Sequence, residues 1–200
     1  RPAARQRRCP ARRVGNTGPV QPITRIASRE VYRNDWMIVR EDDIRRPDGS
    51  PGIYGVVDKP DYALVIAVDG ERVRLVEQFR YPLGERRWEF PQGTAPAPAE
   101  LEPAELAVLE LREETGLSAG TMTALGRLDL APGMSSQRGW VFVATDITEG
   151  DPDREHEEQD MESRWFSRTD VERMILAGEI TDAQSIAAYA KLLLMERSGV

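Results

Sequence analysis

The chain has 200 residues, of which 40% are hydrophobic and 30% charged, a composition typical of a globular protein. Its single cysteine excludes an internal disulfide, and its single histidine, His156, excludes a histidine-rich metal site. No apolar run reaches the roughly 18 residues that a membrane span requires. We therefore expect a cytoplasmic protein whose chemistry depends on carboxylates.

The charge is distributed unevenly along the chain. The formal net charge is −7, yet the first 20 residues contain six arginines and no acid, so the remainder is more acidic than the total indicates. An acidic body argues against nucleic acid as the main partner, because duplex binding needs many basic contacts to phosphates. Residues 1–22 lack apolar periodicity and are expected to be a disordered basic tail. An organelle transit peptide, a vector-derived or upstream-translated extension and a nucleic-acid-binding arm remain alternatives for this tail.

Strands and helices are mixed in the rest of the chain. Apolar runs predict strands over residues 31–39, 53–57, 62–68, 73–79, 125–130, 140–144 and 165–166. Pro47-Asp48-Gly49 is typical of a turn, and Asp69-Gly70 is typical of a hairpin. Helical spacing predicts helices over 101–117, 169–177 and 182–196, the last with Asp182 as its N-cap. Because the order is not a regular βαβ alternation, the sequence favours an α+β fold.

The predicted helix over 101–117 has an acidic face. Glu110, Glu113 and Glu114 lie at positions i, i+3 and i+4, which share one side of a helix. Three carboxylates on one face repel each other unless a cation compensates, and they are ligands that Mg²⁺ or Mn²⁺ prefers. From spacing alone, a solvated acidic surface is the alternative.

The residues on either side of this helix carry a family resemblance. Trp88-Glu89-Phe90-Pro91-Gln92-Gly93 precedes it, and the stretch from Leu109 to Leu117 reads LELREETGL. Together they resemble the signature of the Nudix hydrolases, and segments 76–82, 131–133 and 178–180 are similar to the ADP-ribose pyrophosphatase branch. The resemblance implies a Nudix-type α/β/α sandwich with a mixed sheet and an added N-terminal antiparallel β layer. The domains expected from it are a tail over 1–22, a β layer over 23–58 and a Nudix hydrolase domain over 59–200.

Two features depart from the family pattern. The interval from Gly93 to Leu109 is two residues longer than in the signature, which puts the extra residues in the loop 94–99. Leu109 occupies the position of a signature arginine, and Leu101 occupies that of its glutamate partner. Since replacing both members of a buried ion pair by apolar residues is often neutral, we expect both leucines to be mostly buried, and we expect Leu109→Arg to be destabilising.

The resemblance implies metal-dependent hydrolysis of the pyrophosphate bond of ADP-ribose or a related nucleoside diphosphate sugar, giving AMP and a sugar phosphate. The metal ligands it implies for Mg²⁺ or Mn²⁺ are Glu110, Glu113, Glu114 and the backbone carbonyl of Gln92. Gly93, which follows Gln92, would let the backbone approach the site closely. A Nudix-fold module that binds a nucleotide without cleaving it is the alternative.

The catalytic base is expected in the acidic loop 155–162. Glu158 is the first choice and Glu157 the second, with Glu113 holding a metal-bound water as a third possibility. The alternative is an exposed acidic loop, in which His156 is simply solvated. The sequence therefore gives an ordered set of candidates for the base.

The substrate-binding residues implied by the resemblance are Arg80, Glu89, Ser135, Ser136 and Gln137. Arg80 suits a phosphate, because its planar guanidinium can donate two hydrogen bonds side by side. Glu89 suits a ribose hydroxyl or a metal, and residues 135–137 suit the distal sugar. A surface ion pair, an exposed edge strand and an ordinary polar turn are the respective alternatives.

The strands over 30–57 resemble the extra sheet through which related pyrophosphatases form dimers, so we expect a homodimer. Within them, Tyr32 and Trp36 are expected to be core residues rather than a platform for adenine.

Overall fold

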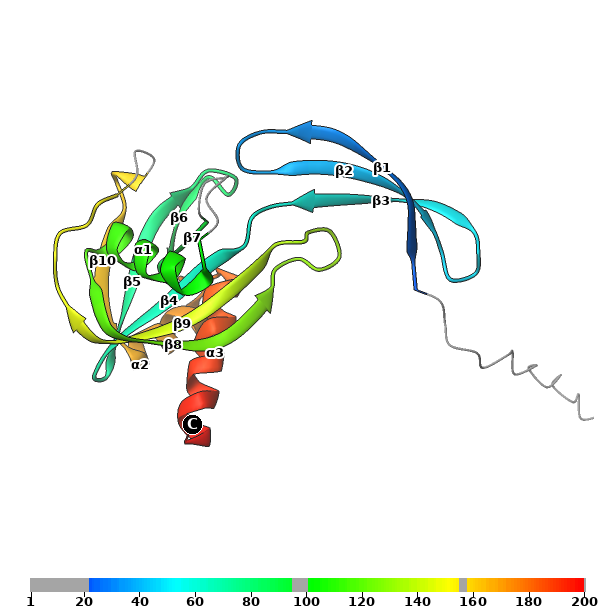
Figure 1. Cartoon of the computed structure of the whole chain (residues 1–200). Coiled ribbons are helices and arrows are strands. Elements are labelled where there is room, and N and C mark those ends of the chain that lie inside the picture. Colours follow the sequence, from blue (N-terminus) through cyan, green and yellow to red (C-terminus); the bar gives the residue numbers. More distant parts are fainter. Residues whose placement is uncertain (1–21, 95–100, 155–157, 200) are drawn as a thin grey trace, which may run out of the picture.

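The computed structural model describes residues 22–94, 101–154 and 158–199, so nearly all of the expected tail 1–22 lies outside it. This part of the chain folds into two sheets and three helices (Figure 1). The strands are β1 (Thr24–Arg33), β2 (Ile38–Arg45), β3 (Pro51–Asp58), β4 (Tyr62–Asp69), β5 (Arg72–Arg80), β6 (Glu85–Glu89), β7 (Gln92–Gly93), β8 (Ser118–Asp129), β9 (Arg138–Thr148) and β10 (Glu162–Ser167). The helices are α1 (Pro103–Thr115), α2 (Arg168–Ala177) and α3 (Ala183–Ser198).

The central sheet is mixed and has the order β10-β5-β4-β9-β8, with β6 added to β5 and β7 to β4. Its one parallel pair in this order, β4 with β9, lies in the middle. Residues 62–67 of β4 are all buried, as expected for a strand that is covered on both faces. Leu106 and Leu111 of α1 pack against one face, and Tyr189 and Leu192 of α3 pack against the other. The expected α/β/α sandwich with a mixed sheet is confirmed.

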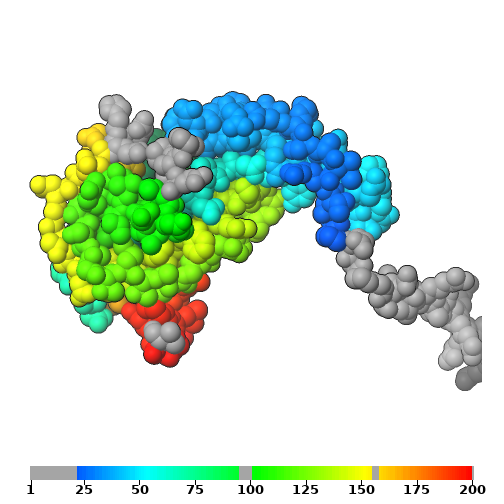
Figure 2. Space-filling model, viewed as in Figure 1, coloured from blue at the N-terminus to red at the C-terminus, as the bar shows by residue number. Residues whose placement is uncertain are grey.

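The N-terminal sheet is antiparallel, has the order β1-β2-β3 and projects from the body of the molecule (Figures 1 and 2). It is joined to the body through the loop after β8. Val57 donates its backbone N–H to the carbonyl of Met134 at 2.8 Å, and the Tyr54 hydroxyl donates to the carbonyl of Gly133 at 2.8 Å. The added β layer is therefore present and is anchored at its β3 edge.

The prediction of one strand over 31–39 is wrong, because the chain turns back between β1 and β2. Asn34 causes the reversal: its side-chain oxygen accepts hydrogen bonds from the backbone N–H groups of Trp36 at 3.0 Å and Met37 at 2.8 Å. The expectation that Tyr32 and Trp36 are core residues is also wrong, since both are exposed, Trp36 to 68%. Every residue of β1 is exposed, so its sequence had no burial alternation to detect.

Helix α1 begins and ends as its sequence predicts. Pro103 occupies the first turn, and the Glu105 carboxylate accepts a hydrogen bond from the backbone N–H of Glu102 at 3.2 Å. Gly116 ends the helix in the left-handed conformation with a φ of 75°, and its N–H donates to the carbonyl of Arg112 at 2.8 Å. The two ends therefore set the length of α1.

The prediction for the two leucines is wrong. Leu101 is 40% exposed and precedes the first turn of α1, and Leu109 is only half-buried. Both line a shallow apolar groove on the outer side of the helix, together with Val108, Glu105 and Arg112. The buried side of α1 carries Leu106 and Leu111 instead, and among the described residues neither Leu101 nor Leu109 belongs to the buried core.

The other predicted strands and helices are correct in type, but most of the predicted strands are shorter than the observed ones. The segment 125–130 belongs almost entirely to the longer β8, which starts at Ser118, after the two residues that follow α1. The short strands β6 and β7 were not predicted, because Glu85–Glu89 is mostly charged and Gln92–Gly93 has only two residues. Both downstream helices and the N-cap at Asp182 are confirmed. No helix in the described ranges has both the length and the apolarity needed to cross a membrane.

Candidate active site

The acidic face of α1 is turned toward the sheet. Glu114 is only 1% exposed, Glu110 is also buried, and Glu113 is half-buried. The Oε2 atom of Glu114 accepts a hydrogen bond from the backbone N–H of Gln92 at 3.1 Å. Its Oε1 atom is buried without a hydrogen-bond partner in the described part of the chain. A solvated acidic surface, the alternative considered for these residues, does not describe Glu110 or Glu114.

Negative charge is concentrated around Glu114. Burial raises the pKa of Glu114 well above its ordinary value, and the neighbouring charges of Glu110, Glu158 and Glu89 raise it further. These four carboxylates come from β6, α1 and the segment before β10. The fold therefore brings together acidic residues that are far apart in the sequence.

The backbone at Gly93 passes directly against Glu110. A Cβ atom placed on Gly93 would lie 2.2 Å from the Oε2 atom of Glu110, far closer than two unbonded heavy atoms can come. A side chain at residue 93 would displace the Glu110 carboxylate from this position. The close backbone approach at Gly93 is thus a feature of the structure.

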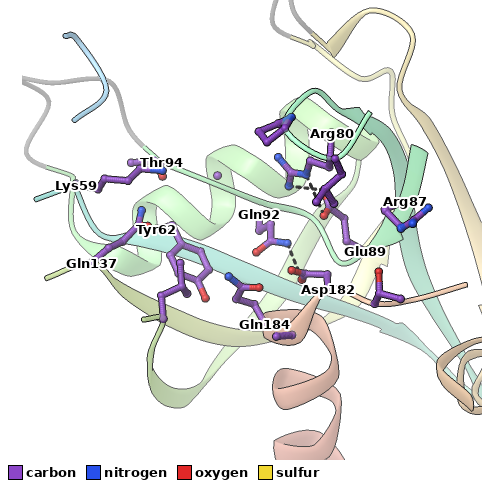
Figure 3. Close-up of a pocket in the computed structure, with 16 residues that line it drawn as sticks. Lys59, Tyr62, Arg80, Arg87, Glu89, Gln92, Thr94, Gln137, Asp182 and Gln184 are labelled. Atoms are coloured by element: carbon purple, nitrogen blue, oxygen red, sulfur yellow. Dashed lines mark hydrogen bonds and ion pairs between the residues drawn. The ribbon is translucent and has the colours of Figure 1, made fainter. Parts of the chain in front are cut away.

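A cavity of about 450 Å³ lies beside the carboxylates (Figure 3). Arg80 and Arg87 contribute positive charge to its wall, and Glu89, Gln92 and Gly93 line it as well. An open cavity with cationic groups next to buried acids is suited to a ligand that contains phosphate.

Arg80 and Glu89 form an ion pair in the wall of this cavity. Glu89 is buried and accepts hydrogen bonds from Arg80 Nη2 at 2.5 Å, Arg80 Nε at 3.2 Å and Gln78 Nε2 at 2.7 Å. Burial raises the pKa of Glu89 to about 7, although Arg80 acts in the opposite direction. Glu89 is therefore not an exposed edge-strand residue, and it holds the Arg80 guanidinium at the cavity.

The loop after β8 brings only one of its three candidates to the cavity. Gln137 is buried, lines the cavity and donates from its side-chain amide to the carbonyl of Pro60 at 2.8 Å. Ser135 donates from its hydroxyl to the carbonyl of Val57 at 2.9 Å, and Ser136 donates to Asp58 Oδ1 at 2.8 Å. In the structure, the two serines fasten this loop to the end of β3.

Glu158 is the candidate base of the acidic loop that the structure describes, while Glu157 and His156 lie outside the described residues. Glu158 is half-buried, and its charge is one of those that raise the pKa of Glu114. Its carbonyl accepts a hydrogen bond from the N–H of Met161 at 2.9 Å. Glu158 consequently lies on the side of its loop that faces the acidic helix.

The donor set of this site fits a divalent cation. The observation that supports the fit is the buried Oε1 atom of Glu114, which no protein group satisfies among the described residues, next to the Glu110 carboxylate. Across those same residues, no group of three or more Asp, Glu, His or Cys side chains is placed to hold a metal ion. Glu110 and Glu114 are the residues that would hold a divalent cation here, and such an ion would supply positive charge between the two carboxylates.

Sequence reasoning missed several residues that line the cavity, among them Tyr62, Asp182, Gln184 and Arg87. The sequence predicts Tyr62 only as the start of an apolar strand and Asp182 only as a helix cap, and Arg87 lies on the unpredicted strand β6. The one signal for Asp182 was its N-cap role, which does not reveal that α3 begins at the cavity.

The fold and the site define a class of protein: an α/β/α sandwich that presents helix carboxylates beside a cationic cavity, as enzymes of phosphate compounds do. A family model for the NUDIX domain matches residues 58–189, and one for the nucleoside diphosphate sugar hydrolase N-terminal domain matches residues 23–57. The chain therefore belongs to the Nudix family, as its sequence signature indicated. Its helix departures at Leu101 and Leu109 do not remove it from that family.

Relatives and a solved structure agree with this assignment. An ADP-ribose pyrophosphatase of Mycobacterium tuberculosis is 35% identical over 164 residues, which are 81% of this chain and 79% of that protein. An ADP-ribose pyrophosphatase of Bacillus subtilis is 28% identical over 173 residues, covering 86% and 92%. The crystal structure of an ADP compounds hydrolase superposes with a TM-score of 0.80 at 19% identity, covering 92% of this chain and 99% of that one, which shows the same fold. The chain is an ADP-ribose pyrophosphatase-like Nudix hydrolase.

Proposed function

We propose that this protein hydrolyses the pyrophosphate bond of ADP-ribose or a related nucleoside diphosphate sugar, with Mg²⁺ or Mn²⁺ as its cofactor. The products are AMP and a sugar phosphate. The observation that carries the proposal is the position of the unsatisfied Glu114 Oε1 atom beside a cavity of about 450 Å³ that contains Arg80 and Arg87. The names of the two pyrophosphatase relatives support the choice of substrate.

Glu110 and Glu114, with Glu113 and the Gln92 carbonyl, are the residues proposed to hold the metal. A divalent ion bound there neutralises charge on the phosphate groups. Arg80 and Arg87 donate hydrogen bonds to phosphate oxygens and orient the substrate. Glu89 keeps the Arg80 guanidinium in place through two hydrogen bonds. Together these groups fix the phosphorus atom relative to the attacking water, which is a large part of phosphoryl-transfer catalysis.

Glu158 is proposed as the general base that takes a proton from the attacking water. Its half-buried position toward Glu114 supports this role. Glu157 is the second candidate, and Glu113 holding the water is the third.

The test is the hydrolysis of ADP-ribose with saturating Mg²⁺ or Mn²⁺, followed by chromatography of AMP and ribose 5-phosphate. We expect both products from the wild-type chain and none in EDTA. Glu114→Gln should lower kcat by about 10²–10³-fold, the usual cost of losing one preorganised electrostatic contact. Glu71→Gln is the matched control, because Glu71 is an exposed acid in the β4–β5 turn, at the opposite end of β5 from Arg80.

A substrate panel of ADP-ribose, other nucleotide sugars, dinucleotides and nucleoside triphosphates then defines the substrate. Tight binding of ADP-ribose without products under either metal would reject the enzyme and favour a nucleotide sensor. Normal turnover by Glu114→Gln would reject the metal site proposed here.

The homodimer is proposed to form through the N-terminal sheet. All residues of β1 and half of those in β3 are exposed, including the large apolar residues Ile26, Val31 and Ile53. Apolar groups on an uncovered sheet are typical of a surface that pairs with another copy.

A further inference from the structure

Tyr62, the first residue of β4, has a buried hydroxyl group whose hydrogen bonding is unsatisfied in the described part of the chain. The side chain is only 5% exposed, and its Oη atom has no hydrogen-bond partner among the described residues. A buried tyrosine hydroxyl normally finds a partner, so an orphaned one calls for an explanation. The ring packs directly against Gly139 of β9, where a Cβ atom would lie only 2.1 Å from Tyr62 Cζ. The space occupied by the Tyr62 ring therefore exists because residue 139 has no side chain.

The surroundings of Tyr62 belong to the cavity wall. Tyr62, Gln92, Asp182 and Gln184 all line the same cavity (Figure 3). The Gln92 side-chain amide donates to Asp182 Oδ2 at 3.1 Å, and that oxygen also accepts from the backbone N–H of Ser185 at 2.8 Å. The hydroxyl of Ser185 in turn accepts from the N–H of Phe90 at 2.9 Å. These bonds make the first turn of α3 a rigid part of the wall.

The charge that acts on the Tyr62 hydroxyl is negative. Arg80 and Arg87 lie on the other side of Gln92 from Tyr62 (Figure 3), and Lys59, a third cation of the cavity wall, is not among the charges that shift the pKa of Tyr62. Beside Tyr62 the acidic group is Asp182, whose negative charge, together with burial, raises the pKa of Tyr62. The phenol thus stays a neutral donor, and Asp182 repels anions and accepts hydrogen bonds. A neutral group that both donates and accepts fits this wall best.

A sugar hydroxyl is such a group, since it accepts from a phenol and donates to a carboxylate at the same time. We propose that Tyr62 determines specificity by donating a hydrogen bond from Oη to a ribose hydroxyl of the substrate, with Asp182 and Gln184 completing the contact. This inference rests on the proposed function, because it names the part of a nucleoside diphosphate sugar that enters this end of the cavity.

The experiment compares wild type with Tyr62→Phe on ADP-ribose and on four analogues, each lacking the 2- or 3-hydroxyl of the adenosine ribose or of the terminal ribose. Tyr62→Phe should lower kcat/KM for ADP-ribose about tenfold, mainly through KM, as expected for one neutral hydrogen bond. For the analogue that lacks the recognised hydroxyl, the two proteins should have equal kcat/KM. Tyr189→Phe is the matched control, because that buried hydroxyl donates to the carbonyl of Arg168 at 3.4 Å and does not line the cavity.

Thermal melting separates the proposed role of Tyr62 from an effect on stability, and calorimetry separates it from the proposed hydrolysis. Tyr62→Phe removes an unsatisfied oxygen, so its Tm should equal or exceed that of the wild type. Titration of the five compounds in EDTA measures Kd without turnover, so a wild type that binds but does not cleave rejects the proposed hydrolysis and still tests Tyr62. Three results would each overturn the role of Tyr62. The first is an equal loss of kcat/KM in Tyr62→Phe on all four analogues, and the second is an unchanged Kd and kcat/KM for ADP-ribose in Tyr62→Phe. The third is the absence of ADP-ribose binding by the wild type.

Discussion

At the scale of single residues, the site depends on the close contacts that Gln92 and Gly93 make with two buried glutamates. Glu110 and Glu114 are buried acids, and a buried carboxylate is costly unless an opposite charge or hydrogen bonds compensate. Gln92 supplies one hydrogen bond to Glu114, and Gly93 allows β7 to lie against Glu110. The two neighbouring residues of β7 therefore set the positions of both carboxylates.

Gly93→Ala tests this dependence. The new methyl group must displace the Glu110 carboxylate, since it would lie 2.2 Å from Oε2. Because a displacement of about 1 Å in a site can cost 10²-fold in rate, we expect a loss of that order in kcat and weaker Mn²⁺ binding. Gly55→Ala is the control, because no atom lies within 4 Å of a Cβ placed at Gly55. The measurement is kcat at increasing Mn²⁺ concentrations. If Gly93→Ala has the kcat and the Mn²⁺ affinity of the wild type, Glu110 does not need this position.

Glu158→Gln tests the general base. Loss of a base lowers kcat by about 10²–10⁴-fold, while the affinity for Mn²⁺ should hardly change because Glu110 and Glu114 remain. Glu157→Gln should be milder, and His156→Ala should be nearly silent. Glu162→Gln, an exposed acid on β10, is the control.

Steady-state kinetics on this set identify the base directly. If Glu158→Gln turns over normally and Glu157→Gln does not, the base is one residue earlier. If both are normal, Glu113 becomes the candidate.

At the scale of elements, α1 shows how far the sequence alone could lead. Pro103 and Gly116 are sequence signals for the two ends of the helix, and they are reliable because they act locally. The 3.6-residue period also put Glu110 and Glu114 on one face. It could not say that Leu109 lies on the outer, half-buried side of α1, since this depends on how α1 docks on β4. In the same way, the cavity role of Asp182 depends on the packing of α3 against residues about 90 positions earlier.

Leu109→Arg tests the corrected position of this leucine. On the half-buried outer side of α1, an arginine at 109 can reach Glu105 one turn earlier, which offsets its proximity to Arg112. We therefore expect the free energy of unfolding to change by no more than about 0.5 kcal/mol, the usual range for surface positions. Leu111→Arg is the comparison, because Leu111 is buried and should lose several kcal/mol. Urea unfolding of both variants decides the matter, and a loss of several kcal/mol for Leu109→Arg would restore the buried position.

At the scale of the whole molecule, the two sheets have different roles. The mixed sheet between α1 and α3 holds the carboxylates and the cavity, whereas the β1–β3 sheet projects from it (Figure 2). The connection runs from β3 to the loop that carries Gln137, through Ser135 and Ser136. A change in the position of the N-terminal sheet can therefore be felt at one wall of the cavity.

The proposed homodimer is tested at this scale. Ile53 is 65% exposed. It pairs across the sheet with Asp43 of β2, which is also exposed, and Asp43 pairs in turn with Ala27 of β1. If a second copy covers this sheet, the wild type should elute with a mass of about 45 kDa, twice the 22.5 kDa of one chain. Val31→Asp combined with Ile53→Asp should then shift the mass to that of a monomer, because burying two unpaired carboxylates at an interface is costly. Leu176→Asp is the control, since Leu176 is 90% exposed on α2, away from the sheet.

Light scattering coupled to gel filtration gives these masses, and circular dichroism verifies that the double variant remains folded. Ile53 is already exposed in the single chain, so its replacement should leave the mixed sheet and its melting transition intact apart from any contribution of dimerisation. A wild type that stays at the monomer mass over a hundredfold range of concentration would exclude the dimer. A double variant that remains a dimer would place the contact on another surface of the molecule.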